Sequence, residues 1–320
     1  MFLFFQGFCM IKITVVVPVY NLGLYLLPSI ESLSNQTLNN DEFEVLFVND
    51  GSTDDSTSII QKYAKCNYRI INQENGRIGA ALNNGIRSAT GEYVLFLDGD
   101  DALSSTALAT IWDASNRNNL DILFYGMKKK MSDNSTRSMR TYCDEECNKV
   151  MSPESYLKSC PLTLNCHYTY KRDFLIRNNL FFVEKVLHED SEFILRACSV
   201  ATRIMNITDV LYYHIDRSCS ITNTYTKQRL LDLSKMIRHM LNYSIERKNT
   251  SIASSLFYYN SMCFNSALKI YRMLSHEDKI VCRETITQLR KDVIFVMLRS
   301  RFPKYIIEGI ILNLLWDAIF

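Results

Sequence analysis

The chain has 320 residues, of which 47% are apolar and 22% are charged, a balance that is typical of a folded protein and excludes wholesale disorder. Its formal net charge is only +2, but residues 1–110 hold six basic and twelve acidic side chains, a net charge of −6. Residues 111–320 therefore carry +8. The division predicts an acidic first part and a basic second part with different roles, and a nucleic-acid partner is not expected.

The ten cysteines are scattered and form no C-x-x-C pair. Cys143 and Cys147 are close in sequence, but no second pair or histidine couple accompanies them, so a structural zinc site is not expected. We interpret the thiols as reduced core residues of a cytoplasmic protein. The apolar start, Met1–Cys9, lacks the features of a signal peptide, and no stretch is apolar enough to span a membrane.

Short apolar strands alternate with helices through the first hundred residues. We expect strands at Ile13–Val17 (ended by Pro18), Glu44–Val48, Arg69–Asn72 and Tyr93–Leu97, and helices at Leu22–Leu33, Asp55–Lys65 and Ala80–Ala89. Alternation of this kind builds a mostly parallel sheet with helices packed on it. The first part of the chain is therefore predicted to be α/β.

The alternation loosens after residue 110. We expect a strand at Asp121–Tyr125, a polar loop or hairpin at Lys128–Cys147, a helix at Ser191–Ser199, a strand at Val210–His214 and long helices within Lys227–Phe320. Nine of the ten glycines lie at or before Gly126, which favours a mostly helical C-terminal part.

The tetrad Asp98-Gly99-Asp100-Asp101 follows the fourth predicted strand directly. Three carboxylates in four residues repel one another unless a cation or a hydroxyl network occupies the site. Carboxylate oxygens suit Mg²⁺ or Mn²⁺, and such a metal commonly bridges protein to phosphate groups. The alternative is an ordinary acidic turn whose aspartates cap a helix.

Asp50 and Tyr20 each follow another predicted strand, so they are expected at the same edge of the sheet as the tetrad, where ligands of open α/β sheets bind. Asp50 begins a turn in which Ser52–Asp54 should cap the next helix, and Asp50 could belong to that turn alone. The ring of Tyr20 could stack on a flat heterocycle or be an ordinary half-buried tyrosine.

An ordered set of motifs resembles the inverting family 2 glycosyltransferases. The set is Pro18-Val19-Tyr20-Asn21, Tyr25-Leu26, Ser32, Gln36-Thr37, Asn49–Asp54, Glu74-Asn75-Gly76, Asn83-Asn84-Gly85, Gly91-Glu92-Tyr93 and Leu97–Asp101. The match is close over residues 12–103 and looser up to residue 222. The resemblance implies a GT-A fold, which is a Rossmann-like nucleotide-diphospho-sugar transferase fold, a nucleotide-sugar donor and a divalent metal, Mn²⁺ or Mg²⁺.

The family's binding residues carry over by position. The resemblance implies nucleotide-sugar contacts from Pro18, Tyr20, Asn21, Asp50, Asn83, Asp98 and Gly99, and metal contacts from Asp100, Asp98 and His214. His214 could equally be a structural residue at a strand end. The family usually has an arginine where this chain has Leu82, and Arg77 either replaces it or is a solvated loop residue.

His188-Glu189-Asp190-Ser191-Glu192-Phe193 resembles the acidic pair of the family that precedes a helix. By position Asp190 is the general base that takes the proton of the acceptor hydroxyl, with Glu189 beside it. The alternative is that the pair only stabilises the N-terminus of the following helix.

The resemblance and the change of pattern divide the chain at residue 222. Residues 1–222 are expected to form the catalytic domain, with a donor-binding half at about 10–110 and an acceptor half at 111–222. Residues 223–320 are expected to form a helical region, in which the basic and apolar tail Lys304–Phe320 either lies on a membrane surface or packs on protein.

We therefore predict an inverting, metal-dependent glycosyltransferase that moves a hexosyl or N-acetylhexosaminyl group, from a UDP-sugar in preference, to a glycan or lipid-linked glycan of the cell surface. It would work in the cytoplasm or on the cytosolic face of the membrane. The alternative is a non-catalytic nucleotide-sugar-binding or scaffold subunit of a glycan-assembly complex. Leu82, in place of the usual arginine, would then be a first sign that the catalytic residues are being lost. The intact acidic residues favour the enzyme.

Overall fold

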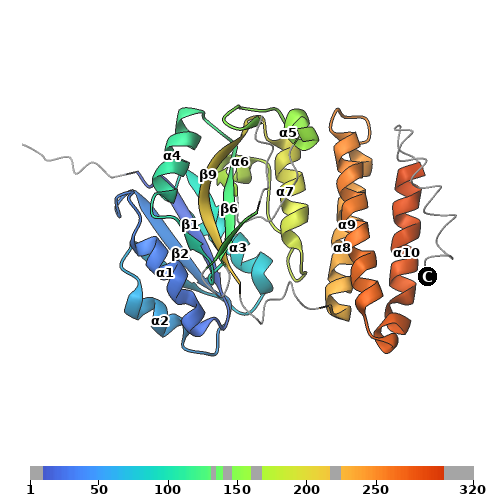
Figure 1. Ribbon diagram of the computed structural model, residues 1–320, viewed down its shortest axis with the longest axis horizontal. Coiled ribbons are helices and arrows are strands. Elements are labelled where there is room, and N and C mark those ends of the chain that lie inside the picture. Colours follow the sequence, from blue (N-terminus) through green and yellow to red (C-terminus); the bar gives the residue numbers. More distant parts are fainter. Residues whose placement is uncertain (1–9, 131–134, 140–145, 160–167, 217–224, 299–320) are drawn as a thin grey trace, which may run out of the picture. The chain divides into compact units, whose positions relative to one another are not determined.

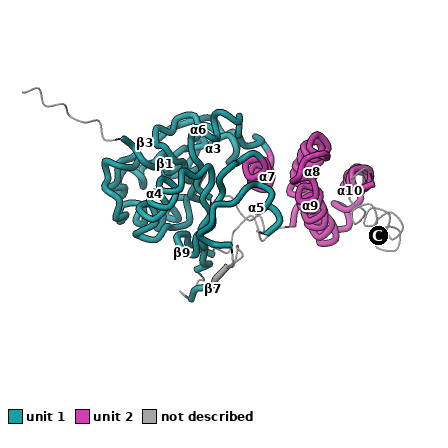
Figure 2. The backbone as a smooth tube through the Cα atoms, turned by 90° about the horizontal axis from the view of Figure 1, so that it is seen from above, with its two compact units in different colours: residues 1–185, 200–217 teal, residues 186–199, 218–320 magenta. Residues whose placement is uncertain are grey.

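The computed structural model describes the chain except residues 1–9, 131–134, 140–145, 160–167, 217–224 and 299–320 (Figure 1). The chain forms two compact units (Figure 2). The first consists of Met1–Lys185 and Val200–Arg217, and the second of Val186–Ser199 and Ser218–Phe320. The tail Lys304–Phe320, for which we expected either membrane contact or packing on protein, lies outside the described residues, as does Cys143.

The first unit is built on one mixed sheet, whose described strands follow the order β3-β2-β1-β4-β8-β6-β9-β5, with β7 paired to β6. The strands are β1 (Ile13–Val19), β2 (Phe43–Asn49), β3 (Tyr68–Asn72), β4 (Tyr93–Phe96), β5 (Ala102–Leu103), β6 (Ile122–Lys130), β7 (Thr136–Met139), β8 (Tyr168–Lys171) and β9 (Ile204–Ile215). Strands β1 to β4 are parallel, as the alternation predicts, and so are β6 and β9. Antiparallel pairing of β8, β7 and β5 makes the second half of the sheet mixed.

Helices cover both faces of the parallel part. The helices described in the first unit are the 3₁₀ turn η1 (Gly23–Leu26), α1 (Leu27–Ser34), α2 (Ser56–Tyr63), α3 (Arg77–Ser88), α4 (Ala107–Arg117), α5 (Pro153–Ser159) and α6 (Arg172–Arg177). One face of the sheet packs against α1, α2 and α4, through Val15, Val17, Ile30, Ile60 and Leu108. On the opposite face, Gly85 of α3 lies so close that a side-chain carbon there would be 2.2 Å from Val16 Cγ1. The parallel part of the sheet is therefore covered on both sides, which explains why its central strands β1, β2 and β4 are mostly apolar.

The prediction that Pro18 ends the first strand is wrong, because β1 continues to Val19. Successive residues of a strand face alternate neighbours. Val16 O accepts from Leu97 N on the β4 side, and Val19 O accepts from Asp50 N on the β2 side. Pro18 therefore faces the β4 side, beyond the last β4 pair at Val16 and Phe96, where the missing N–H breaks no ladder bond.

The second unit is helical in its described residues, with α7 (Glu189–Val200), α8 (Lys227–Glu246), α9 (Ala253–Met273) and α10 (His276–Leu298). Apolar side chains of the last three helices form one core, which includes Leu230, Ile237, Phe264, Leu268, Ile286 and Leu289. The helical pattern expected after Lys227 is thus confirmed up to Leu298. Among the helices described, none is both long and apolar enough to cross a bilayer.

Candidate active site

The turns that follow β1 and β2 are tied to each other at the carboxyl edge of the parallel strands. Asn21 has a left-handed backbone with φ 49°, its N–H donates to Ser52 Oγ at 3.1 Å, and its side-chain oxygen accepts from Thr53 N at 2.8 Å. Only Asp54 of the three expected helix caps bonds to the helix, accepting from Ser56 N at 3.1 Å. Ser52 and Thr53 hold Asn21 instead, which leaves Tyr20 51% exposed at the edge.

Asp50 is buried and joins the turn after β2 to the turn after β3. Its Oδ1 accepts from Gln73 Nε2 and from Gly76 N, both at 2.8 Å, and its backbone oxygen accepts from Asn75 Nδ2 at 3.0 Å. Gly51, the next residue, adopts φ 76°, and a side-chain carbon there would lie 3.1 Å from Asn75 N. The sequence indicated a polar turn after β2, but the contacts with residues 73–76 join partners that a sequence pattern does not reveal.

The acidic tetrad follows β4 and lies against the end of β1. A side-chain carbon on Gly99 would be 2.5 Å from Leu22 Cδ1 and 3.1 Å from Pro18 O, so a larger residue would push the tetrad away from β1. Asp98 and Asp100, on either side of Gly99, are half-buried, and Asp98 N donates to Tyr212 Oη at 3.3 Å. The structure thus brings Pro18 and Gly99 together, two residues that we predicted as donor contacts.

Asp101 is the buried anchor of this tetrad. Its side chain accepts from Tyr212 Oη at 2.6 Å and from Ile215 N at 2.8 Å, and its Oδ2 lies 3.2 Å from His214 Nδ1. The hydrogen bond with Asp101 and the negative charges of Asp98 and Asp100 raise the pKa of His214 above its ordinary value, against the effect of burial. Residues on β9 therefore fix the tetrad and place a histidine beside its carboxylates. Our list of site residues missed Asp101 and Tyr212, although Asp101 belongs to the acidic tetrad and Tyr212 to the strand expected at Val210–His214.

The Asp101→Asn variant is expected to lower the free energy of unfolding by about 2–4 kcal/mol, because an amide has one acceptor oxygen and must turn N–H donors toward Tyr212 or Ile215. Denaturant unfolding of the purified chain measures this loss. Asp209→Asn, which changes an exposed aspartate of β9, is the matched control and should change stability little. Equal stability of the two variants would mean that Asp101 is not an anchor.

The carboxylate oxygens of the tetrad fit a divalent cation only when oxygens of the substrate complete its coordination shell. Among the residues that the structure describes, no three His, Cys, Asp or Glu side chains are grouped closely enough to hold a metal by themselves. Mg²⁺ is commonly bound by one or two carboxylates together with phosphate oxygens, and Asp98 and Asp100 can supply those carboxylates. His214 is the third predicted ligand; its Nδ1 lies 3.2 Å from Asp101 Oδ2, and its contact with a metal stays a prediction.

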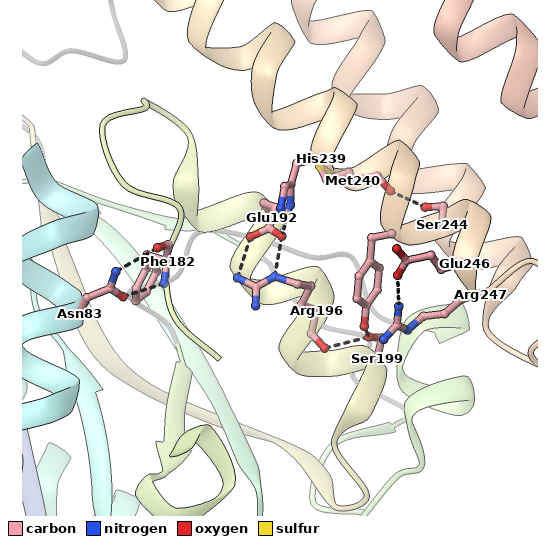
Figure 3. Close-up of polar contacts among 11 residues, drawn as sticks. Asn83, Phe182, Glu192, Arg196, Ser199, His239, Met240, Ser244, Glu246 and Arg247 are labelled. Atoms are coloured by element: carbon pink, nitrogen blue, oxygen red, sulfur yellow. Dashed lines mark hydrogen bonds and ion pairs between the residues drawn. The ribbon is translucent and has the colours of Figure 1, made fainter. Parts of the chain in front are cut away.

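Asn83 is buried and bonds to the chain segment that covers α3. It donates to Phe182 O at 2.9 Å and accepts from Phe182 N at 2.7 Å (Figure 3). It also donates to Glu184 Oε1 at 3.0 Å. These contacts suit a role for Asn83 in positioning residues 182–184. The predicted contact of Asn83 with the nucleotide sugar stays a prediction. Leu82 is buried as well, while Arg77 is exposed, and its Nη1 donates to Lys185 O at 3.1 Å.

Glu189 and Asp190 occupy the first turn of α7, in the second unit. Glu189 is buried and Asp190 is half-buried, with Oδ1 accepting from Ser191 N at 2.7 Å. The charge of Asp190 also acts on Cys263 of α9, whose pKa burial raises to about 12. The role of this acidic pair in sugar transfer stays a prediction.

Comparison with known proteins shows which family the chain resembles. The model of glycosyl transferase family 2 matches residues 14–181. The glycosyltransferase EpsJ of Bacillus subtilis is 36% identical over 222 residues, which are 66% of this chain and 62% of EpsJ. TarS of Staphylococcus aureus, a poly(ribitol-phosphate) β-N-acetylglucosaminyltransferase, is 31% identical over 209 residues, which are 64% of this chain and 35% of TarS. The chain therefore spans less than two thirds of either relative.

Solved structures share the fold. The crystal structure of S. aureus TarS 1–349 in complex with UDP-GlcNAc matches with a TM-score of 0.70 and 22% identity, over 91% of this chain and 84% of that one. A mannosyltransferase from Pyrobaculum calidifontis, in complex with GDP-Man and Mn²⁺, matches with a TM-score of 0.54 and 17% identity, over 96% and 87% of the two chains. The α/β sheet with its acidic edge is thus the GT-A fold, and the chain belongs to glycosyltransferase family 2.

Proposed function

We propose that the protein transfers a sugar, with inversion at the anomeric carbon, from a UDP-sugar to a glycan acceptor in the synthesis of a cell-surface polysaccharide. The observation that carries the proposal is the carboxyl edge of β1, β2 and β4, where hydrogen bonds fix both Asp50 and the acidic tetrad. The chain that presents this edge belongs to family 2. The name of the relative TarS, a β-N-acetylglucosaminyltransferase, and the UDP-GlcNAc bound to it support the donor class.

The donor half of the site would hold the nucleotide. The exposed ring of Tyr20 offers a surface on which a base can stack, and the buried carboxylate of Asp50 can accept from an N–H of the base. Asp98 follows at the next strand end, where the ribose and diphosphate would lie. We keep residues 10–110 as the donor-binding half and 111–222 as the acceptor half as part of this proposal.

Asp98 and Asp100 would hold the divalent cation, Mn²⁺ or Mg²⁺, and the Mn²⁺ in the mannosyltransferase complex supports such a requirement. When bound, the cation supplies positive charge to the diphosphate as it departs. Asp101 and Tyr212 would keep both carboxylates in place, and an N–H of the His214 ring could donate a hydrogen bond to a phosphate oxygen.

The transfer is a single displacement. Asp190 accepts the proton of the acceptor hydroxyl while the acceptor oxygen bonds to the anomeric carbon, and the bond from that carbon to the diphosphate breaks, with its electron pair leaving on UDP. Glu189 lies next to the base. The acceptor would be a glycan or a lipid-linked glycan, and the tail Lys304–Phe320 would contact the cytosolic face of a membrane as part of the same proposal.

The test is a panel of UDP-, GDP- and dTDP-sugars incubated with the full chain and Mn²⁺ or Mg²⁺, with release of nucleoside diphosphate as the readout. We expect UDP-sugars to give the largest release and chelation of the metal to abolish it. A chain that binds UDP-sugars but releases no diphosphate under either metal would be the scaffold subunit of our alternative reading.

A further inference from the structure

Helix α7 begins with the acidic pair Glu189 and Asp190. Three polar contacts link this helix and the residue before it to α8. His188, just before α7, contacts Arg229, Glu192 contacts His239, and Ser199 shares a hydrogen bond with Tyr243. All these residues belong to the second unit, which assembles the C-terminal helices with the helix that bears the proposed base.

The middle contact centres on a buried carboxylate (Figure 3). The side chain of Glu192 is 1% exposed, and it accepts from Arg196 Nε at 2.5 Å, from Arg196 Nη2 at 2.9 Å and from His239 Nδ1 at 2.8 Å. A buried carboxylate is tolerated only with such partners, so the contact fixes which side of α7 faces α8.

The first contact lies next to the acidic pair. His188 adopts φ 68°, a left-handed conformation that a residue with a side chain rarely takes without outside support. Its Nε2 accepts from Arg229 Nε at 3.1 Å, which requires a neutral ring with its proton on Nδ1. Burial and the charge of Arg229 lower the pKa of His188, while the charges of Asp190 and Asp232 act in the opposite direction.

We infer that Arg229 of α8 is a positioning residue for sugar transfer, which through His188 holds the backbone that presents Asp190 to the acceptor. The inference rests on the proposed function, since it needs Asp190 to be the base. A misplacement of about 1 Å at a reacting group can lower the rate about 10²-fold. The loss of this contact should therefore lower kcat much more than it lowers the melting temperature.

The experiment compares Arg229→Gln with Arg238→Gln in the full chain. Arg238 is the matched control, because it is also on α8 but its Nε pairs with Asp292 of α10, at 3.0 Å. With the best donor of the panel, Arg229→Gln should lower kcat about tenfold or more, while the donor KM and the affinity for UDP stay within about twofold. Arg238→Gln should leave kcat unchanged.

A double-mutant cycle on kcat tests the route through His188. Asparagine tolerates the left-handed backbone of residue 188, but His188→Asn removes the ring nitrogen that accepts from Arg229. The variant should therefore lower kcat by itself. If Arg229 acts through His188, adding Arg229→Gln to His188→Asn should cost little more. Additive losses, a kcat of Arg229→Gln equal to that of wild type, or a loss that follows a lowered melting temperature would overturn the inference. A wild-type chain without any turnover would instead overturn the proposed function.

Discussion

The Asp100→Asn variant is expected to lose about 10²-fold or more of the metal-dependent turnover while the fold stays intact. Asp100 is half-buried between Gly99 and the buried Asp101, and it is one of the two carboxylates that can bridge a cation to the diphosphate. An amide keeps the size of the side chain but has no charge, so both the affinity for the cation and the stabilisation of the departing diphosphate should fall.

Stability should change in the opposite direction. Three carboxylates in four residues repel one another without a cation, and removing one charge relieves that repulsion. The melting temperature without metal should therefore stay the same or rise slightly, as thermal unfolding can show. Asp113→Asn, on the exposed side of α4, is the matched control for a lost aspartate charge. Full metal-dependent turnover in Asp100→Asn would exclude Asp100 as a ligand.

The parallel half of the fold could be predicted because its strands carry a local signal. Every residue of β2, Phe43–Asn49, is buried, and all but Glu44 and Asn49 are apolar, a pattern typical of a strand covered on both faces. The element ends were less accurate. The helix expected at Leu22–Leu33 begins as the 3₁₀ turn η1 and becomes α1 only near Pro28, because a proline is accepted in the first turn of a helix.

The connections within the site could not be predicted, because they join distant parts of the chain. The bond between Asp101 and Tyr212 spans 111 positions, and its donor is a tyrosine that a strand pattern identifies only as core. The contact between His188 and Arg229 spans 41 positions and depends on how α7 lies beside α8. Local periodicity contains neither fact, since it describes one element at a time.

The Asp190→Asn variant is expected to slow sugar transfer by about 10²- to 10⁴-fold, the usual contribution of a general base. Asparagine has nearly the same shape, and its oxygen can still accept from Ser191 N, the contact that Asp190 Oδ1 makes at 2.7 Å. It cannot take the proton of the acceptor hydroxyl. Affinity for UDP should be unchanged, because the proposed nucleotide contacts Tyr20 and Asp50 lie on the first unit.

A purely structural role makes a different set of predictions. If Asp190 only complements the N-terminus of α7, the loss of its charge should cost about 0.3–1 kcal/mol of stability, and turnover should fall only as far as folded protein is lost. Measuring transfer rate, UDP affinity and melting temperature on the same variant separates the two roles. Glu189→Gln is the matched control, since it removes the neighbouring charge from the same turn of α7. A rate loss confined to Glu189→Gln would move the base to Glu189, because both carboxylates belong to one acidic turn and only the one that faces the acceptor can take its proton.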